Sequence, residues 1–378
     1  MVNLSELRRM VIGELMAAGF ESSGGLLVPP ADSDKQSIRA LHQAQRSQVL
    51  AKAANFIETW ENRVLGSFAD GDEVDPEQIN PAVVQVTTEE EAAIFRYASL
   101  HWSVPVSQGY GRRTRFLIMD QSNGKLIGIF ALGDPVFNLK VRDDLIGWGP
   151  EQRKRRLYNV FDAFVLGAVE PYRQLIGGKL AALCAVSDET RIFLKEKYDG
   201  TRTIIDQQVK IATPVLITTT SALGRSSVYN RLTFGDRKVL QPIGFTEGFG
   251  HFQFSDDVFT ELVELARRDD PRRGNEYGDG PNWKMRTIRS SLQKLGLSGN
   301  LLKHGIKREV FIAPLSFGWR AFLRGETDVI RPVAYPLGDI SRYYSERWAI
   351  PRAQRMPGFR SWDHHGMRLS SQMVTLRR

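Results

Sequence analysis

Apolar side chains recur with helical spacing at the start of the chain. One face of a first helix carries Leu4, Leu7, Val11 and Leu15. A break rich in glycine and proline follows at residues 24–34, and residues 34–69 predict one long helix or two. The acidic, proline-containing stretch 70–81 predicts a linker, so we expect an N-terminal helical region that ends at residue 78.

The middle of the chain alternates between strand and helix patterns. Strands are predicted at residues 82–86, 114–120, 125–133, 164–169, 213–220, 238–245 and 251–255. Helices are predicted at residues 87–102, 177–186, 187–198 and 225–232. The turn sequence QSNG at residues 121–124 lies between two of the strands and predicts a hairpin.

Helical patterns return at residues 256–270 and 282–297, and REVFIAPL at 308–315 reads as one further strand. The pattern as a whole predicts an α/β fold: a mixed central sheet with an N-terminal helical region and C-terminal helical additions. We expect four parts, at residues 1–78, 79–255, 256–338 and 339–378.

Composition narrows the class of protein. The chain has 378 residues, of which 42% are hydrophobic and 25% charged, as is usual for a soluble globular protein. No apolar run is long enough to cross a bilayer, and the N-terminus reads as a helix rather than a signal peptide. The single cysteine, Cys184, lies in an apolar helix, so we expect a cytoplasmic protein in which it is a small core residue.

Positive charge is concentrated at the C-terminus. The net charge is +8, and the stretch from Ser341 to Arg378 holds eight arginines, one glutamate and one aspartate. Arginine interleaved with aromatic residues suits phosphates and stacked bases. The candidate nucleic-acid-binding residues here are Arg342, Arg347, Trp348, Arg352, Arg355, Arg360 and Trp362. The alternative is a basic tail that packs its aromatic side chains on the body of the protein or on a partner.

Two further basic clusters could neutralise phosphates, or could be ordinary solvated faces. They contribute the candidates Arg112, Arg113, Arg153, Lys154, Arg155 and Arg156.

The stretch VEPYRQLIGGKLAALCA, residues 169–185, leads from a strand through two glycines into an apolar helix. Glycines let the backbone approach an anion, and a helix N-terminus favours negative charge. Gln174, Gly177, Gly178 and Lys179 are therefore candidates for binding a CoA-like or nucleotide cofactor; the alternative is a turn that only packs a helix on a sheet.

The order of elements over residues 82–255 resembles the GCN5-related N-acetyltransferase fold, whose glycine turn holds the pyrophosphate of acyl-CoA. The resemblance implies that Tyr229 is a general acid toward a departing thiolate. Two departures stand out: Lys179 replaces a small residue of the turn motif, and the insertion at residues 134–162 is longer than usual.

Other chemistry is possible at hydroxyl and carboxylate side chains. Ser226 could be a nucleophile if His251 lay beside it as the base. Asp134 and Asp143, with Asp144 and Asp162 nearby, could bind Mg²⁺ for a nuclease, but carboxylates at turns and helix starts also serve as caps. We predict no metal site and keep the nuclease as the weaker alternative.

Longer segments resemble a second family. DKQSIRALH, SQGYGRRTRFLIMD, GKLIGIFALGDPVFNLKVRDDLIGW, TTTSALGRSSVYNRL, GFTEGFGHF and LLKHGIKREVFIAPL are similar to the Druantia anti-phage system protein A family over residues 35–325. The resemblance implies a prokaryotic defence context, with other defence proteins, including a helicase-like component, as partners. It implies no particular reaction.

Together these patterns predict a nucleic-acid-binding defence component built on an acetyltransferase-like core, with DNA or RNA as partner and no membrane association. The alternative is an active group-transfer enzyme that modifies nucleic acid or protein. Whether the chain is an enzyme stays open at this stage.

Overall fold

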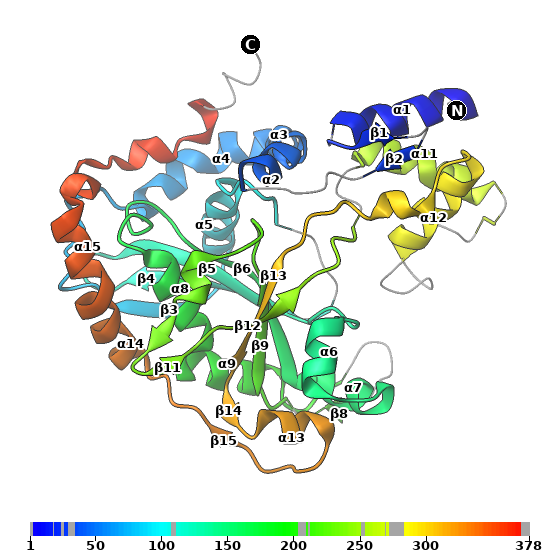
Figure 1. Ribbon diagram of the computed structural model, residues 1–378. Helices are drawn as coiled ribbons and strands as arrows, with labels where there is room; N and C mark the ends of the chain where they lie inside the picture. Colours follow the sequence, from blue (N-terminus) through cyan, green and yellow to red (C-terminus); the bar gives the residue numbers. More distant parts are fainter. Residues whose placement is uncertain are drawn as a thin grey trace. The chain divides into compact units, whose positions relative to one another are not determined.

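The chain divides by its internal contacts into two units, shown in Figure 1. The computed structural model describes residues 3–17, 19–23, 26–28, 35–106, 111–202, 209–210, 212–250, 254–268, 270–271 and 283–371. Unit 1 comprises residues 1–48, 222–225 and 245–308, and unit 2 comprises residues 49–221, 226–244 and 309–378. The four ranges predicted from the sequence cut across these units and stay a prediction about independently folding parts.

Unit 1 is mainly helical. It contains α1 (Leu4–Ala17), the hairpin of β1 (Glu21–Ser23) and β2 (Leu26–Val28), α2 (Lys35–Leu41), the first part of α3 (Gln43–Lys52), α11 (Asp256–Arg267), α12 (Trp283–Lys294) and a 3₁₀ turn, η3 (Gly299–Leu302). Its core joins the predicted apolar face of α1, through Leu7, Val11 and Leu15, to α11 and α12. The stretch predicted as a break thus includes the strand of a small hairpin.

Unit 2 is built on a seven-stranded sheet in the order β12-β13-β9-β6-β5-β4-β3. The strands are β3 (Pro81–Gln85), β4 (Arg113–Asp120), β5 (Lys125–Gly133), β6 (Val160–Ala168), β9 (Leu216–Thr220), β12 (Gln241–Phe245) and β13 (Glu309–Pro314). β6 and β9 pair in parallel, whereas β3-β4, β4-β5, β5-β6 and β9-β13 pair antiparallel. This confirms the predicted α/β class with a mixed central sheet.

Short strands and helices surround the sheet. They are α4 (Ala54–Val64), η1 (Leu65–Ser67), α5 (Glu89–Leu100), α6 (Lys140–Ile146), α7 (Pro150–Arg156), η2 (Leu157–Asn159), α8 (Gly177–Val186), α9 (Asp188–Tyr198), β7 (Thr201–Arg202), β8 (Val209–Lys210), α10 (Ser227–Asn230), β10 (Thr233–Phe234), β11 (Arg237–Lys238), β14 (Ser316–Phe317), α13 (Trp319–Arg324) and β15 (Arg331–Pro332).

The predicted hairpin is confirmed, because β4 and β5 join through residues 121–124, where Gly124 has a φ of 74°. The predicted strand at 251–255 falls largely on residues 251–253, which lie outside the described residues. The strand beside β12 is instead β13, which the chain reaches only after the helices of unit 1. Local pattern could not show this order, since strand pairing across a long insertion leaves no mark in the sequence.

α8 is the central helix of unit 2. Almost every residue from Gly177 to Val186 is buried, as expected of a helix that is apolar on all sides. It packs against β5 and β6 on one side and against α14 (Leu337–Tyr344) on another. The first helix of the arginine-rich C-terminal segment, α14, is therefore a structural layer over α8.

That C-terminal segment is mostly helical. After α14 it continues through a π-helical turn, η4 (Ser345–Ala349), into α15 (Ile350–Arg355), and then through the 3₁₀ turns η5 (Pro357–Ser361) and η6 (His364–Met367). Figure 1 shows it in orange and red along one side of unit 2. Tyr344, Trp348 and Phe359 lie in the same core as α8, which matches the alternative in which the aromatic side chains pack on the body.

Among the described residues, none of the helices combines the length and the apolar character needed to span a bilayer.

Candidate functional site: the glycine turn and the C-terminal segment

The glycine turn between β6 and α8 makes several hydrogen bonds within its own backbone. The N–H groups of Leu175 and Gly177 both donate to the carbonyl oxygen of Tyr172, at 3.0 and 2.8 Å, and that of Lys179 donates to Ile176 at 2.9 Å. A Cβ on Gly177 would lie 2.7 Å from the Tyr172 oxygen, too close for any side chain. A phosphate at this turn would have to displace these bonds, so the geometry is that of a packing turn.

The C-terminal segment covers the same turn. The Tyr344 hydroxyl donates to the Leu175 carbonyl oxygen at 2.9 Å, and Nε of Arg352 donates to that of Gln174 at 3.1 Å. Nζ of Lys179 lies 4.2 Å from the centre of the Trp348 ring and donates to the Arg231 carbonyl oxygen at 3.0 Å. Of the four predicted cofactor residues, Gln174 and Lys179 are thus in contact with side chains of the C-terminal segment.

Positive charge gathers beside the turn. Burial lowers the pKa of Lys179, and the nearby guanidinium groups of Arg347 and Arg231 lower it further. Both arginines are exposed, and within the described residues neither has an ion-pair partner. Sequence reasoning missed Arg231, because a single arginine after a short helix carries no pattern.

The predicted nucleic-acid residues of the C-terminal segment separate by exposure. Arg342, Arg347, Arg355 and Arg360 are exposed, Arg352 and Trp362 are half-buried, and Trp348 is only 8% exposed. Arg342 pairs with Asp339 at 3.3 Å, and both side chains are largely exposed, so this ion pair contributes little. The exposed arginines form a surface, whereas the Trp348 ring packs in the core.

In the other basic clusters, part of the charge is neutralised by ion pairs. Arg112 pairs with Asp134 at 2.7 Å and lies over the rings of Tyr158 and Phe161. Arg113 is half-buried and lies over the ring of Phe164.

The basic cluster on α7 contains two paired and two exposed side chains. Arg153 pairs with Asp143 at 3.1 Å, and Arg156 pairs with Asp328 at 2.6 Å. Lys154 and Arg155 remain exposed.

Two of the three predicted catalytic residues, Ser226 and Tyr229, make structural contacts. The Ser226 hydroxyl caps α10 by accepting the Tyr229 N–H at 3.2 Å, and the Ser226 N–H donates to Oε2 of Glu309. The Tyr229 ring packs edge-on against Phe311, and burial raises its pKa to about 12. His251 lies outside the described residues, so the predicted Ser226–His251 pair has no geometry to report.

The two carboxylates considered for a nuclease, Asp134 and Asp143, accept hydrogen bonds from arginines. Asp134 accepts from Arg112, and Asp143 is held by Arg142 and Arg153. Within the described part, the one group of three ligand-type side chains close enough to share a metal ion is Asp70, Asp363 and His364. There Asp70 accepts hydrogen bonds from the backbone N–H and from the ring Nδ1 of His364, at 2.7 and 2.8 Å. These two bonds fasten the C-terminal segment.

Asp162 should make stability pH-dependent. Burial raises its pKa to about 6, although the Thr218 hydroxyl donates to it at 2.6 Å. Because the folded state then holds a proton that the unfolded chain releases near pH 4, stability falls as the pH rises from about 4 to 6. Asp162→Asn should remove this part of the fall. Urea midpoints of both proteins at pH 4.5 and 7.5 check it, and parallel pH dependence of the two would contradict it.

The described residues define a mixed α/β protein with a helical insertion and an arginine-bearing C-terminal layer. The model of the family "Druantia protein DruA" matches residues 32–325 of the chain. "Druantia protein DruA" of Escherichia coli (strain UMEA 4076-1) is 43% identical over 370 residues, which cover 96% of this chain and 91% of that protein. The chain belongs to the DruA family. No solved structure matches it.

Proposed function

We propose that the chain is a nucleic-acid-binding component of a Druantia anti-phage defence system. Family membership supports the defence context, and the exposed arginines of the C-terminal segment support the binding role. Other proteins of the system, including a helicase-like component, are its proposed partners.

The outward face of α14–α15 and the following turn carries the proposal. Arg347, Arg355 and Arg360 are exposed, and within the described residues none of them has an ion-pair partner. Guanidinium groups are suited to phosphate oxygens, and a helix that already fixes the positions of these residues lowers the entropy cost of binding. Lys154 and Arg155 on α7 are equally exposed, but Figure 1 places α7 and α15 on opposite sides of unit 2.

Triple replacement of Arg347, Arg355 and Arg360 by glutamine should weaken binding and flatten its salt dependence. Each phosphate contact contributes about 0.7–0.9 to the slope of log K against log salt, so three contacts give about 2–3. Anisotropy titrations of labelled DNA and RNA between 50 and 200 mM salt measure it. Lys154→Gln with Arg155→Gln is the matched control and should keep most of the slope. Salt-independent binding, or equal loss in the control, would refute this surface.

An acetyltransferase-like core is proposed as the scaffold for this surface. The resemblance rests on the order strand, helix, hairpin, strand, glycine turn, helix, strand, short helix and two strands. β3, α5, the β4–β5 hairpin, β6, the glycine turn, α8, β9 and α10 follow in that order, with α6 and α7 between β5 and β6 and α9 between α8 and β9. This order also favours the group-transfer alternative, whereas the occupied N–H groups of the turn argue against it. A retained CoA or nucleotide mass, lost in Gly178→Asp, would move the assignment to the enzyme; Gly178 has room for the new side chain.

A further inference from the structure

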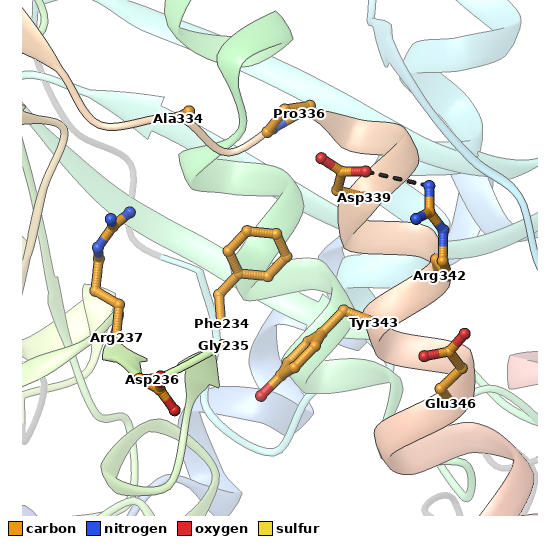
Figure 2. A pocket seen from close by; sticks show the side chains of 10 residues that line it. All are labelled: Phe234, Gly235, Asp236, Arg237, Ala334, Pro336, Asp339, Arg342, Tyr343 and Glu346. Carbon is orange, nitrogen blue, oxygen red and sulfur yellow. Dashed lines mark hydrogen bonds and ion pairs between the residues drawn. The ribbon is translucent and has the colours of Figure 1, made fainter.

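An open cavity of about 900 Å³ lies between the β10–β11 hairpin and α14, and Arg342 of the C-terminal segment is part of its lining (Figure 2). Phe234 of the hairpin and Tyr343 of α14 form its centre, with ring centres 5.2 Å apart and planes at 72°. The Tyr343 hydroxyl is within 3.0 Å of that of Thr233, which fixes the ring. Both rings are half-buried, so each keeps part of its surface open.

The polar lining of the cavity carries both signs of charge. Figure 2 shows Arg237 on the hairpin side, Asp339 and Arg342 on α14, and Glu346 on η4, which follows α14. Arg237 is exposed, with its guanidinium 5.6 Å from the centre of the Tyr335 ring. Glu346 is exposed, and within the described residues it has no ion-pair partner. The cavity therefore offers flat apolar surface, guanidinium donors and carboxylate acceptors together.

We infer that this cavity binds one unpaired guanine base of a single strand whose phosphates lie on the arginines of the C-terminal segment. The inference rests on the proposed function and names the part of the nucleic acid that is read. Unpaired bases stack on aromatic side chains and are read along their hydrogen-bonding edges.

Guanine fits the mixed lining best because it presents two adjacent acceptors to a guanidinium group and two adjacent donors to a carboxylate. Its O6 and N7 atoms accept hydrogen bonds, which an arginine guanidinium such as that of Arg237 can donate. Its N1–H and N2–H groups donate, and a carboxylate such as that of Glu346 can accept both. Thymine and uracil offer one N–H group and cannot satisfy a carboxylate in this way.

The test uses the full chain and ten-nucleotide oligothymidylates with one central G, A or C. The G strand should bind about 5-fold or more tightly than the others, since a bidentate base contact is worth about 1–3 kcal/mol. Glu346→Gln should abolish this preference and leave the salt slope unchanged. Glu151→Gln, an exposed carboxylate on α7, is the control and should change neither.

Three results decide the inference. Salt-dependent binding without preference for G, or a preference that survives in Glu346→Gln, overturns the guanine site and leaves the proposed function standing. No binding of any strand overturns both. Displacement of the G strand by GMP but not by AMP supports a guanine site and shows that the free nucleotide also enters it.

Discussion

Replacing Tyr344 by alanine should lower the free energy of unfolding by about 3–5 kcal/mol, the range for deletion of a large aromatic ring from a core. The Tyr344 side chain is fully buried between α8 and the C-terminal segment, and its hydroxyl donates to the Leu175 carbonyl oxygen at 2.9 Å. The substitution opens a cavity and leaves that carbonyl without its donor. Urea unfolding followed by tryptophan fluorescence measures the loss.

Tyr344→Phe separates the two contributions. It keeps the ring and removes only the hydroxyl, so it should cost about 1 kcal/mol, the net value of one hydrogen bond. Gln354→Ala, at an exposed position of α15, is the surface control and should change stability by less than about 0.5 kcal/mol. If Tyr344→Ala behaved like Gln354→Ala, the C-terminal segment would not be part of the core in solution.

The C-terminal segment therefore cannot be removed to test its charge. A chain cut near Gly338 would lose Ile340, Tyr344, Trp348 and Phe359 from the core of unit 2. Any loss of nucleic-acid binding would then report unfolding. Replacement of exposed arginines by glutamine changes the charge and leaves these core positions intact.

The spacing of those apolar positions can be recognised in the sequence. Ile340, Tyr344 and Trp348 recur every four residues, which is the period of a buried helical face. Composition drew attention to arginine and aromatic content instead, and content alone cannot separate a stacking surface from a packed one. The same helix supplies both: its aromatic face is buried and its arginine face is exposed.

Local signals predicted most strands of the seven-stranded sheet and the helices α5, α8 and α9, but neither the helices of the C-terminal segment nor the full strand order. The start of α5, which the structure shows as a capping box at Thr88, and the turn at Asn123–Gly124 are set by neighbouring residues, so the sequence predicted the helix and the hairpin. The place of β13 between β12 and β9 depends on pairing across the insertion from residue 245 to 308, which no local pattern encodes.

The sequence predicted where the candidate site lies, but not whether its glycine turn binds an anion or packs a helix. A glycine at position 177 serves equally for an anion site or for close packing, since both require a missing Cβ. What distinguishes them is whether the N–H groups of the turn are free. Those of Gly177 and Lys179 donate to carbonyl oxygens of the turn itself, and Arg352 of the covering segment donates to the Gln174 carbonyl oxygen. The pocket hairpin did leave a signal, the Gly-Asp pair at 235–236, which is a two-residue turn sequence.

Glu61→Ala should release the far end of the C-terminal segment. Glu61 is 5% exposed and accepts from the Tyr97 hydroxyl and the Leu369 N–H, each at 2.7 Å, and from Ser370. Leaving a buried donor without an acceptor costs about 1–3 kcal/mol, so loss of this acceptor should cost about 2–4 kcal/mol. The urea midpoint should fall, and brief trypsin treatment should cut faster after Arg368, as intact mass would show.

The pKa of Glu61 gives this contact a pH signature. Burial alone would raise it, but the hydrogen bonds from Ser370, Tyr97 and Leu369 outweigh burial and hold the pKa below its ordinary value. The stability that Glu61 contributes is therefore complete above the ordinary carboxyl pKa and is lost as the pH falls through the lowered one. Glu58→Ala, at an exposed position of the same helix, should leave both the midpoint and the cleavage rate unchanged. Equal cleavage after Arg368 in Glu61→Ala and wild type would mean that Glu61 does not fasten the segment, and that its other contacts, including the Asp70–His364 hydrogen bonds, hold it.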